Sequence, residues 1–276
     1  MTERSLFVFF RISLGLYLFW YFETLRPYME ELFGVNGIYT KRAEIPFPSI
    51  LPALGDARGL IFVSFALMLS SAAIAVGYQR RVMAVIVLYG LACLRSWNGL
   101  LSPPSDGYLG WLLLATALIP QGEGSGLHRL RRDWRIPAPI LTAALAVFAV
   151  SYTCSGLDKL RSEVWTSGQT LGIAFNGPLA RVYFINDLFN HAPTIVLKIL
   201  TWISLASEVL CAPLCLFARG RKIAWGAILI MHIGALATLV LTSVSLAMLL
   251  FNLFLIPIIF PHTSSQQAVD GGDRSI

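Results

Sequence analysis

The chain has 276 residues, of which 56% are apolar and 13% are charged, and its formal net charge is +6. Soluble proteins carry about twice that share of charged residues, so the composition excludes an ordinary soluble domain and predicts an integral membrane protein. The basic residues cluster in short loops between apolar segments, which is a signal of membrane topology. We therefore expect the lipid bilayer as a partner and no binding to nucleic acid.

The first apolar stretch, from Leu6 to Leu25, predicts a membrane helix. It is too long for a cleaved signal peptide, contains Arg11 and has no small-residue cleavage site. Arg11 lies about one turn inside the helix, so we interpret its side chain as snorkelling to the cytoplasmic headgroups. The alternative is an interior ion pair. Glu23 is too distant to be the partner, at about 18 Å along the helix, and Glu208 is the candidate.

Residues 26–58 form a connection longer than a turn needs, and its apolar run indicates either a cap on the outer face or a short interfacial helix. The region from Trp165 to Pro193 is too polar to span and predicts a second excursion at the outer face. Further apolar segments predict seven more membrane helices, at 60–76, 82–94, 108–119, 140–157, 195–217, 223–241 and 244–260.

The predicted fold is thus an all-α, polytopic bundle of about eight transmembrane helices. It forms one domain over residues 1–260, and the polar tail over 261–276 is expected to be disordered. With both termini in the cytoplasm, the basic loops at Arg80, 129–135 and 219–222 all fall on the cytoplasmic side, as the positive-inside rule requires. We expect a protein of the cell inner membrane whose Lys159, Asp106 and Asn98 share the outer face.

Cysteine and histidine placement argues against a disulfide framework and a metal site. The cysteines all fall inside apolar segments, which favours small buried hydrophobes; a metal or redox pair one helical turn apart is the alternative for the last two. The histidines lie on different segments without ligand spacing, so no metal site is predicted. These residues are Cys93, Cys154, Cys211 and Cys215, and His128, His191, His232 and His262.

Charge gathers where the 140–157 helix ends, at Asp158, Lys159, Arg161 and Glu163. Charge at such a depth is usually functional or paired. Lys159 acts as a base only when it is neutral, and a poorly hydrated cavity favours that form. The alternative is a lysine that snorkels from a helix end.

The pattern Tyr-x3-Gly-x2-Lys-Leu-x4-Trp-x2-Gly, from Tyr152 to Gly168, resembles the signature of the HTTM domain, the membrane domain shared with vitamin K-dependent gamma-carboxylase. The resemblance implies that Lys159 is the base that deprotonates reduced vitamin K. It also implies a reduced lipid quinone as cofactor, oxygen and carbon dioxide as co-substrates, and a peptide or protein substrate. Tyr152 and Trp165 are then candidate quinone-binding residues.

A second constellation, Trp97-Asn98 followed by Asp106-Gly-Tyr108-Leu, resembles the family's Trp-Asn and Tyr-Leu motifs. The resemblance adds Trp97, Asn98 and Tyr108 to the quinone-binding candidates. The carboxylases carry a histidine at the position of Asp106. An ionised Asp106 close to Lys159 would favour the charged amine, and the carboxylate would then be the candidate base. The other interpretation is a turn in which Asp106 caps the next helix.

Glu208 lies near the middle of the 195–217 segment, where a bare carboxylate costs about 2.5 to 3.5 kcal/mol. It must be protonated, paired or beside water. His232 is a candidate to share its proton, and both residues match positions where the family carries them. Either a structural contact between helices or a role in proton transfer explains them.

The resemblance therefore implies an enzyme that couples quinol oxidation to deprotonation of an acceptor. Because this chain stops soon after its last apolar segment, whereas the carboxylases carry a large soluble region there, carboxylation of protein glutamates is not expected. The alternatives are a non-catalytic membrane module that binds lipid or a partner protein, and a maturation factor for a secreted peptide.

Overall fold

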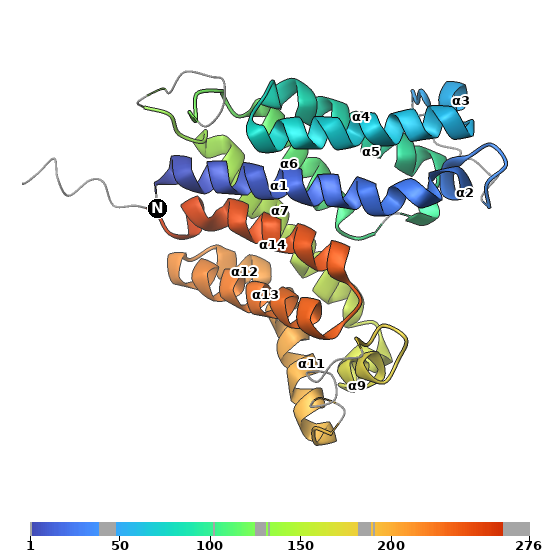
Figure 1. Ribbon diagram of the computed structural model, residues 1–276. Helices are drawn as coiled ribbons and strands as arrows, with labels where there is room; N and C mark the ends of the chain where they lie inside the picture. The colour runs from blue at the N-terminus through green and yellow to red at the C-terminus, as the bar shows by residue number, and fades with distance from the viewer. Residues whose placement is uncertain are drawn as a thin grey trace, which may run out of the picture.

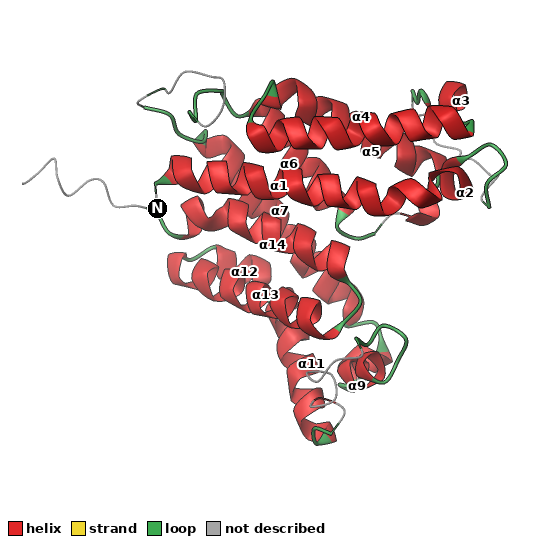
Figure 2. Cartoon of the chain, viewed as in Figure 1, coloured by secondary structure: helices red, strands yellow, loops and turns green. Residues whose placement is uncertain are grey.

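The computed structural model describes residues 2–38, 48–101, 103–124, 131, 133–181, 189 and 191–261. Over this part of the chain the structure is all-helical, as predicted (Figure 2), and Ala180 and Leu239 form an isolated bridge. Several predicted features lie outside the described residues. They are His128, Arg129 and Arg132 of the basic loop, residues 182–188 of the second excursion, and the tail from His262.

The long helices follow the predicted apolar segments to within a few residues, except that the predicted 195–217 segment is divided into two helices (Figure 1). They are α1 (Glu3–Leu25), α4 (Ala57–Val76), α5 (Arg80–Trp97), α6 (Asp106–Leu118), α7 (Ala138–Lys159), α11 (Thr194–Val209), α13 (Ala218–Thr238) and α14 (Thr242–Ile259). The short ones are η1 (Arg26–Tyr28), α2 (Met29–Phe33), α3 (Leu51–Leu54), η2 (Gly99–Leu101), α8 (Glu163–Thr166), α9 (Thr170–Phe175) and α12 (Cys211–Cys215).

Four helices of the described chain are long and apolar enough to cross a membrane. They are the segment Glu3–Phe33 together with α4, α7 and α14. By contrast, α6 has 13 residues and rises about 20 Å, which is less than the roughly 30 Å of a bilayer's hydrocarbon core. The helices thus support membrane localisation, while eight crossings stay a prediction.

In the bundle, α1 packs between α4 and α14 (Figure 1). The pairs α4 with α5 and α5 with α6 complete one side, and α13 packs on α14 at the other. The start of α11 and the short helix α9 project away from the bundle (Figure 1) and carry a small separate apolar cluster around Phe175, Leu197 and Leu239. α7 joins the two parts, because it contacts α11, α12 and α14.

Helices α1 and α4 approach closely at Gly15. A Cβ atom on Gly15 would lie 2.6 Å from the carbonyl oxygen of Ser71 and 2.6 Å from the amide nitrogen of Ala75. Both are backbone atoms that a rotamer change cannot move. Small residues at such crossings let membrane helices gain van der Waals contact.

We expect Gly15→Ala to destabilise the protein by about 1 to 3 kcal/mol, because overpacking forces the two backbones apart. Thermal unfolding of the detergent-solubilised protein, followed by size-exclusion chromatography, measures the loss. Gly226→Ala is the matched control, since Gly226 is also helical but has no atom within 4 Å of the position that an added methyl group would take. Equal melting temperatures for the two variants would contradict the tight crossing.

A buried ionic cluster lies near the start of α1 and α5. Arg80 is fully buried, and its Nε donates to Glu123 Oε1 at 2.8 Å. Arg11 Nη1 donates to the same oxygen at 3.2 Å, and the Arg11 side chain is only 2% exposed. The interpretation of Arg11 as a snorkelling residue is therefore wrong, because its guanidinium turns inward to Glu123. Its partner is not Glu208 either.

Arg80 and its neighbour Arg81 close the end of α6. Arg80 donates to the carbonyl oxygens of Thr116, Ile119 and Pro120, and Arg81 Nε donates to that of Ala117 at 2.7 Å. The last carbonyls of a helix have no partner within it. Two guanidinium groups thus satisfy carbonyls at the end of this short helix.

The predicted burial of the cysteines holds for Cys93, Cys211 and Cys215. It is wrong for Cys154, whose side chain is exposed on α7. Helical periodicity explains the difference, because only one face of α7 packs against the other helices.

Candidate functional site

Lys159 and Glu208 form the centre of the candidate site. Lys159 is the last residue of α7, and its Nζ lies 2.5 Å from both carboxylate oxygens of Glu208 on α11. The lysine side chain is 25% exposed and the glutamate 3%, so the amine is the accessible member of the pair. The ammonium also lies 4.5 Å from the ring centroid of Trp165 on α8, within the range of a cation–π contact.

The polar groups of α7 share one helix face. Tyr152, Ser155, Gly156 and Lys159 are spaced by three or four residues, which places them in one row. Ser155 Oγ donates to Glu208 Oε2 at 3.1 Å. The face that carries this row of residues is therefore the face that meets α11.

Gly156 permits the close approach of the two backbones. A Cβ atom there would lie 2.6 Å from the amide nitrogen of Val209 and 2.9 Å from the carbonyl carbon of Glu208. A side chain at this position would separate α7 from α11. The glycine thus brings Glu208 within reach of Lys159.

Directly after Glu208 the predicted 195–217 helix is broken, because α11 ends at Val209 and α12 begins at Cys211. Pro213 has no N–H group, so the carbonyl of Val209 lacks its usual helical partner. Our prediction of one continuous helix missed this break, although Pro213 was a signal for it.

The Glu208 carboxylate is thus the group beside Lys159 whose oxygen atoms can accept a proton.

A second hydrogen-bonded pair lies deeper along α7. The Tyr152 hydroxyl is 2.7 Å from His232 Nε2 on α13, and both side chains are buried. The Tyr108 ring of α6 contacts the Tyr152 ring, with the centroids 5.9 Å apart. The partner of His232 in this structure is thus Tyr152 and not Glu208.

Asp106 forms a different ion pair. Its carboxylate accepts from Arg95 of α5, whose Nη2 lies 2.9 Å from Asp106 Oδ1 and 2.7 Å from the Tyr21 hydroxyl. The carboxylate that accompanies Lys159 is Glu208. Asp106 is the first residue of α6 and Ser105 precedes it at the N-cap, so the turn interpretation is off by one residue.

Trp97 and Asn98 are placed at the junction of α5 with α2. Asn98 Nδ2 donates to the carbonyl oxygen of Leu32 at 3.0 Å, and Trp97 is 5% exposed within the apolar core. Among the predicted site residues, the structure brings Lys159 into contact with both Glu208 and Trp165, and it places the Tyr108 ring at a tilt of 42° against that of Tyr152, the partner of His232. It places Asp106, Trp97, Asn98 and Arg11 in other contacts.

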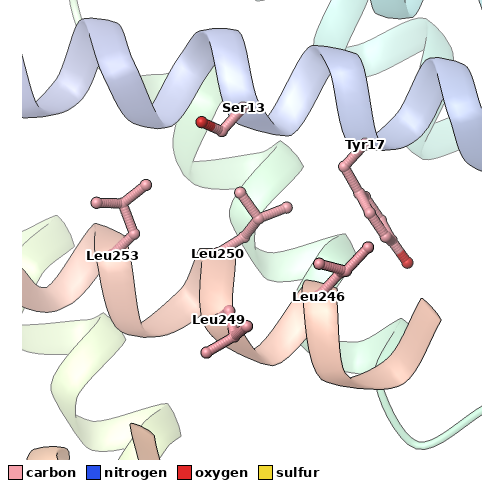
Figure 3. A pocket seen from close by; sticks show the side chains of 6 residues that line it. All are labelled: Ser13, Tyr17, Leu246, Leu249, Leu250 and Leu253. Atoms are coloured by element: carbon pink, nitrogen blue, oxygen red, sulfur yellow. The ribbon is translucent and has the colours of Figure 1, made fainter. Parts of the chain in front are cut away.

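An apolar pocket of about 210 Å³ lies between α1 and α14. In Figure 3, leucines from α14 face Ser13 and Tyr17 of α1 across it. None of the predicted site residues lines it; the lining residues are Ser13, Tyr17, Leu246, Leu249, Leu250 and Leu253. Among the described residues, no group of three or more His, Cys, Asp and Glu side chains is arranged to hold a metal ion.

Comparison with protein-family models, with curated proteins and with solved structures gives no match for this chain.

Proposed function

We propose that the protein is a membrane enzyme of the HTTM type whose Lys159–Glu208 pair removes a proton from a lipid-soluble quinol. The observation that carries the proposal is the pairing of a partly exposed amine with a buried carboxylate beside an aromatic ring. These residues suit a quinol, because the Lys159–Glu208 pair accepts a proton from its hydroxyl group and Trp165 provides a flat apolar surface for its ring. When bound, a reduced quinone supplies the oxidation chemistry, with oxygen and carbon dioxide as co-substrates.

Lys159 and Glu208 have different roles because they differ in exposure. Lys159 meets the substrate, because it is the exposed member, and its ammonium first gives one proton to Glu208 across 2.5 Å. The amine is then neutral and accepts the substrate proton at Nζ. Ser155 holds the second carboxylate oxygen in place. The buried glutamate thus holds the proton that Lys159 must release before it acts as a base.

The proposed topology has eight crossings, with α11 and α12 together forming one of them. Both termini then lie in the cytoplasm of a cell inner membrane, as the basic loops indicate. The start of α1 and the end of α14 lie at the same end of the bundle (Figure 1), which supports this arrangement. Lys159 lies at the opposite, outer end, where a quinone in the bilayer and a peptide or protein substrate have access.

We expect Lys159→Ala and Glu208→Gln to lower quinol-dependent oxygen uptake by about 10² to 10⁴-fold, the usual contribution of a positioned acid–base group. Lys159→Arg keeps the charge and is expected to be equally inactive, because a guanidinium does not lose its proton. The assay uses the full chain in lipid nanodiscs with a series of reduced quinones.

Arg161→Ala is the matched control, since its ion pair with Asp158 is exposed, and it is expected to keep its turnover. Full turnover in Lys159→Arg would contradict the neutral-amine step. A wild-type protein that consumes no oxygen with any of the quinols would overturn the proposed function.

A non-catalytic role is the second candidate, and one observation favours it. Lys159, Glu208 and Ser155 satisfy one another, as residues that fix helix packing do. In that case the protein is a module that binds lipid or a partner, or a maturation factor for a secreted peptide. The variants above would then lose stability without any quinol-dependent activity in the wild type.

A further inference from the structure

We infer that Thr153 and Gly156 are positioning residues for Glu208, an inference that rests on the proposed function. Neither side chain contacts the Lys159 amine in the structure. Both act on the backbone of α11, at the point where this helix is broken. The position of the proton-accepting carboxylate is therefore set from α7 by two residues without acid–base chemistry, of which Gly156 belongs to the motif and Thr153 occupies one of its unspecified positions.

The hydroxyl of Thr153 interrupts the backbone hydrogen bonds between α11 and α12. In a continuous helix the amide of Ala212 would donate to the carbonyl of Glu208, four residues earlier. Here the Ala212 amide donates to Thr153 Oγ1 at 2.9 Å. The insertion of a side chain into such a ladder of hydrogen bonds is a recognised cause of a helix kink.

The same hydroxyl faces the two carbonyl groups that the break releases. Thr153 Oγ1 lies 3.4 Å from the carbonyl oxygen of Glu208, which has lost Ala212, and 3.5 Å from that of Val209, which has lost a donor to Pro213. An unpaired backbone group in an apolar environment costs several kcal/mol, so the break depends on this hydroxyl. Thr153 thus stabilises the bend next to the catalytic carboxylate.

Gly156 sets the distance between the backbones of α7 and α11, whereas Thr153 sets the direction of the chain at the break that follows Glu208. The missing Cβ of Gly156 lets the backbone at Glu208 and Val209 rest directly on α7. One turn further along the same face stands Lys159. If α11 and α12 formed one straight helix, or if α11 lay further from α7, the Glu208 carboxylate would be displaced from the Lys159 amine.

A carbodiimide cross-link tests the geometry without relying on turnover. A hydrophobic carbodiimide joins an amine and a carboxylate in contact as an amide, and mass spectrometry of the digested full-length protein measures the yield. We expect a Lys159–Glu208 cross-link in the wild type and about a tenfold lower yield in Thr153→Val, because a displacement of about 1 Å strongly slows a proximity-dependent reaction.

Thr153→Ser is expected to restore the yield. Ser207→Ala is the matched control, because it removes a hydroxyl next to Glu208 that bonds only within its own helix, to the carbonyl of Ile203 at 2.7 Å. Gly156→Ala is expected to lower the yield in the same way; if it fails to fold, the folded Thr153→Val variant decides.

An unchanged yield in Thr153→Val, or no cross-link in the wild type, would overturn the inference. If the wild type shows no quinol-dependent turnover while the yields change as expected, the proposed function fails and the positioning of Glu208 by Thr153 stands.

Discussion

Lys159→Met is expected to lower the melting temperature of the solubilised protein more than the double variant Lys159→Met/Glu208→Gln does. The single change leaves a carboxylate that is 3% exposed without its cation. Breaking a buried pair in this way costs about 3 to 5 kcal/mol, whereas removing both charges costs much less. Because the lysine is partly exposed, we expect a loss near the lower end, about 3 kcal/mol.

A double-mutant cycle of Lys159→Met and Glu208→Gln measures the coupling between the two side chains. The stability readout is thermal unfolding in one detergent at one pH. Additive losses from the two single variants would mean that the side chains do not interact, and would remove the basis of the proposed proton transfer.

Arg80→Met is expected to lower the free energy of unfolding by at least as much, about 3 to 5 kcal/mol. It removes one of the two arginines that pair with Glu123 and leaves the carbonyls of Thr116 and Ile119 without the donor that Arg80 provides. Each buried acceptor left unsatisfied adds about 1 to 3 kcal/mol before the structure relaxes. The fraction of protein that elutes as a monodisperse peak, and its melting temperature, report the loss.

Arg161→Met provides the matched control for Arg80→Met. It also removes a paired arginine, but its side chain is 84% exposed and that of Asp158 75% exposed. Exposed pairs contribute about 0 to 1 kcal/mol, so little change is expected. Comparable losses of stability in the two variants would show that the hydrogen bonds from Arg80 to the end of α6 do not contribute to stability.

The helices could be predicted from the sequence because the apolar segments are long and their boundaries are polar. The expected segments at 108–119 and 244–260 correspond to Asp106–Leu118 and Thr242–Ile259. The break after Val209 has a local signal in Pro213, but the contact between the Thr153 hydroxyl and the Ala212 amide joins two different helices. A local pattern cannot show that Thr153 lies opposite Ala212.

The sequence identified residues of the site but not their pairing. Lys159, Glu208 and Trp165 were each selected, while Asp106 was considered as the neighbour of the lysine. Which charged side chains pair depends on which helices are neighbours and how each is rotated, and a sequence motif carries no information about either. Glu123 was not selected at all, although an acidic residue just after an apolar segment and close to basic loops was a signal for an inward ion pair.

The proposed topology has a consequence for the lipid around α6. In that topology α6 crosses the membrane with Leu114 and Leu118 exposed to acyl chains, although the helix rises only about 20 Å. The bilayer beside so short a crossing must become thinner to match it, at a cost of a fraction of a kcal/mol per ångström. We therefore expect the protein to be more stable in short-chain than in long-chain phosphatidylcholine and to favour the thinner regions of a membrane.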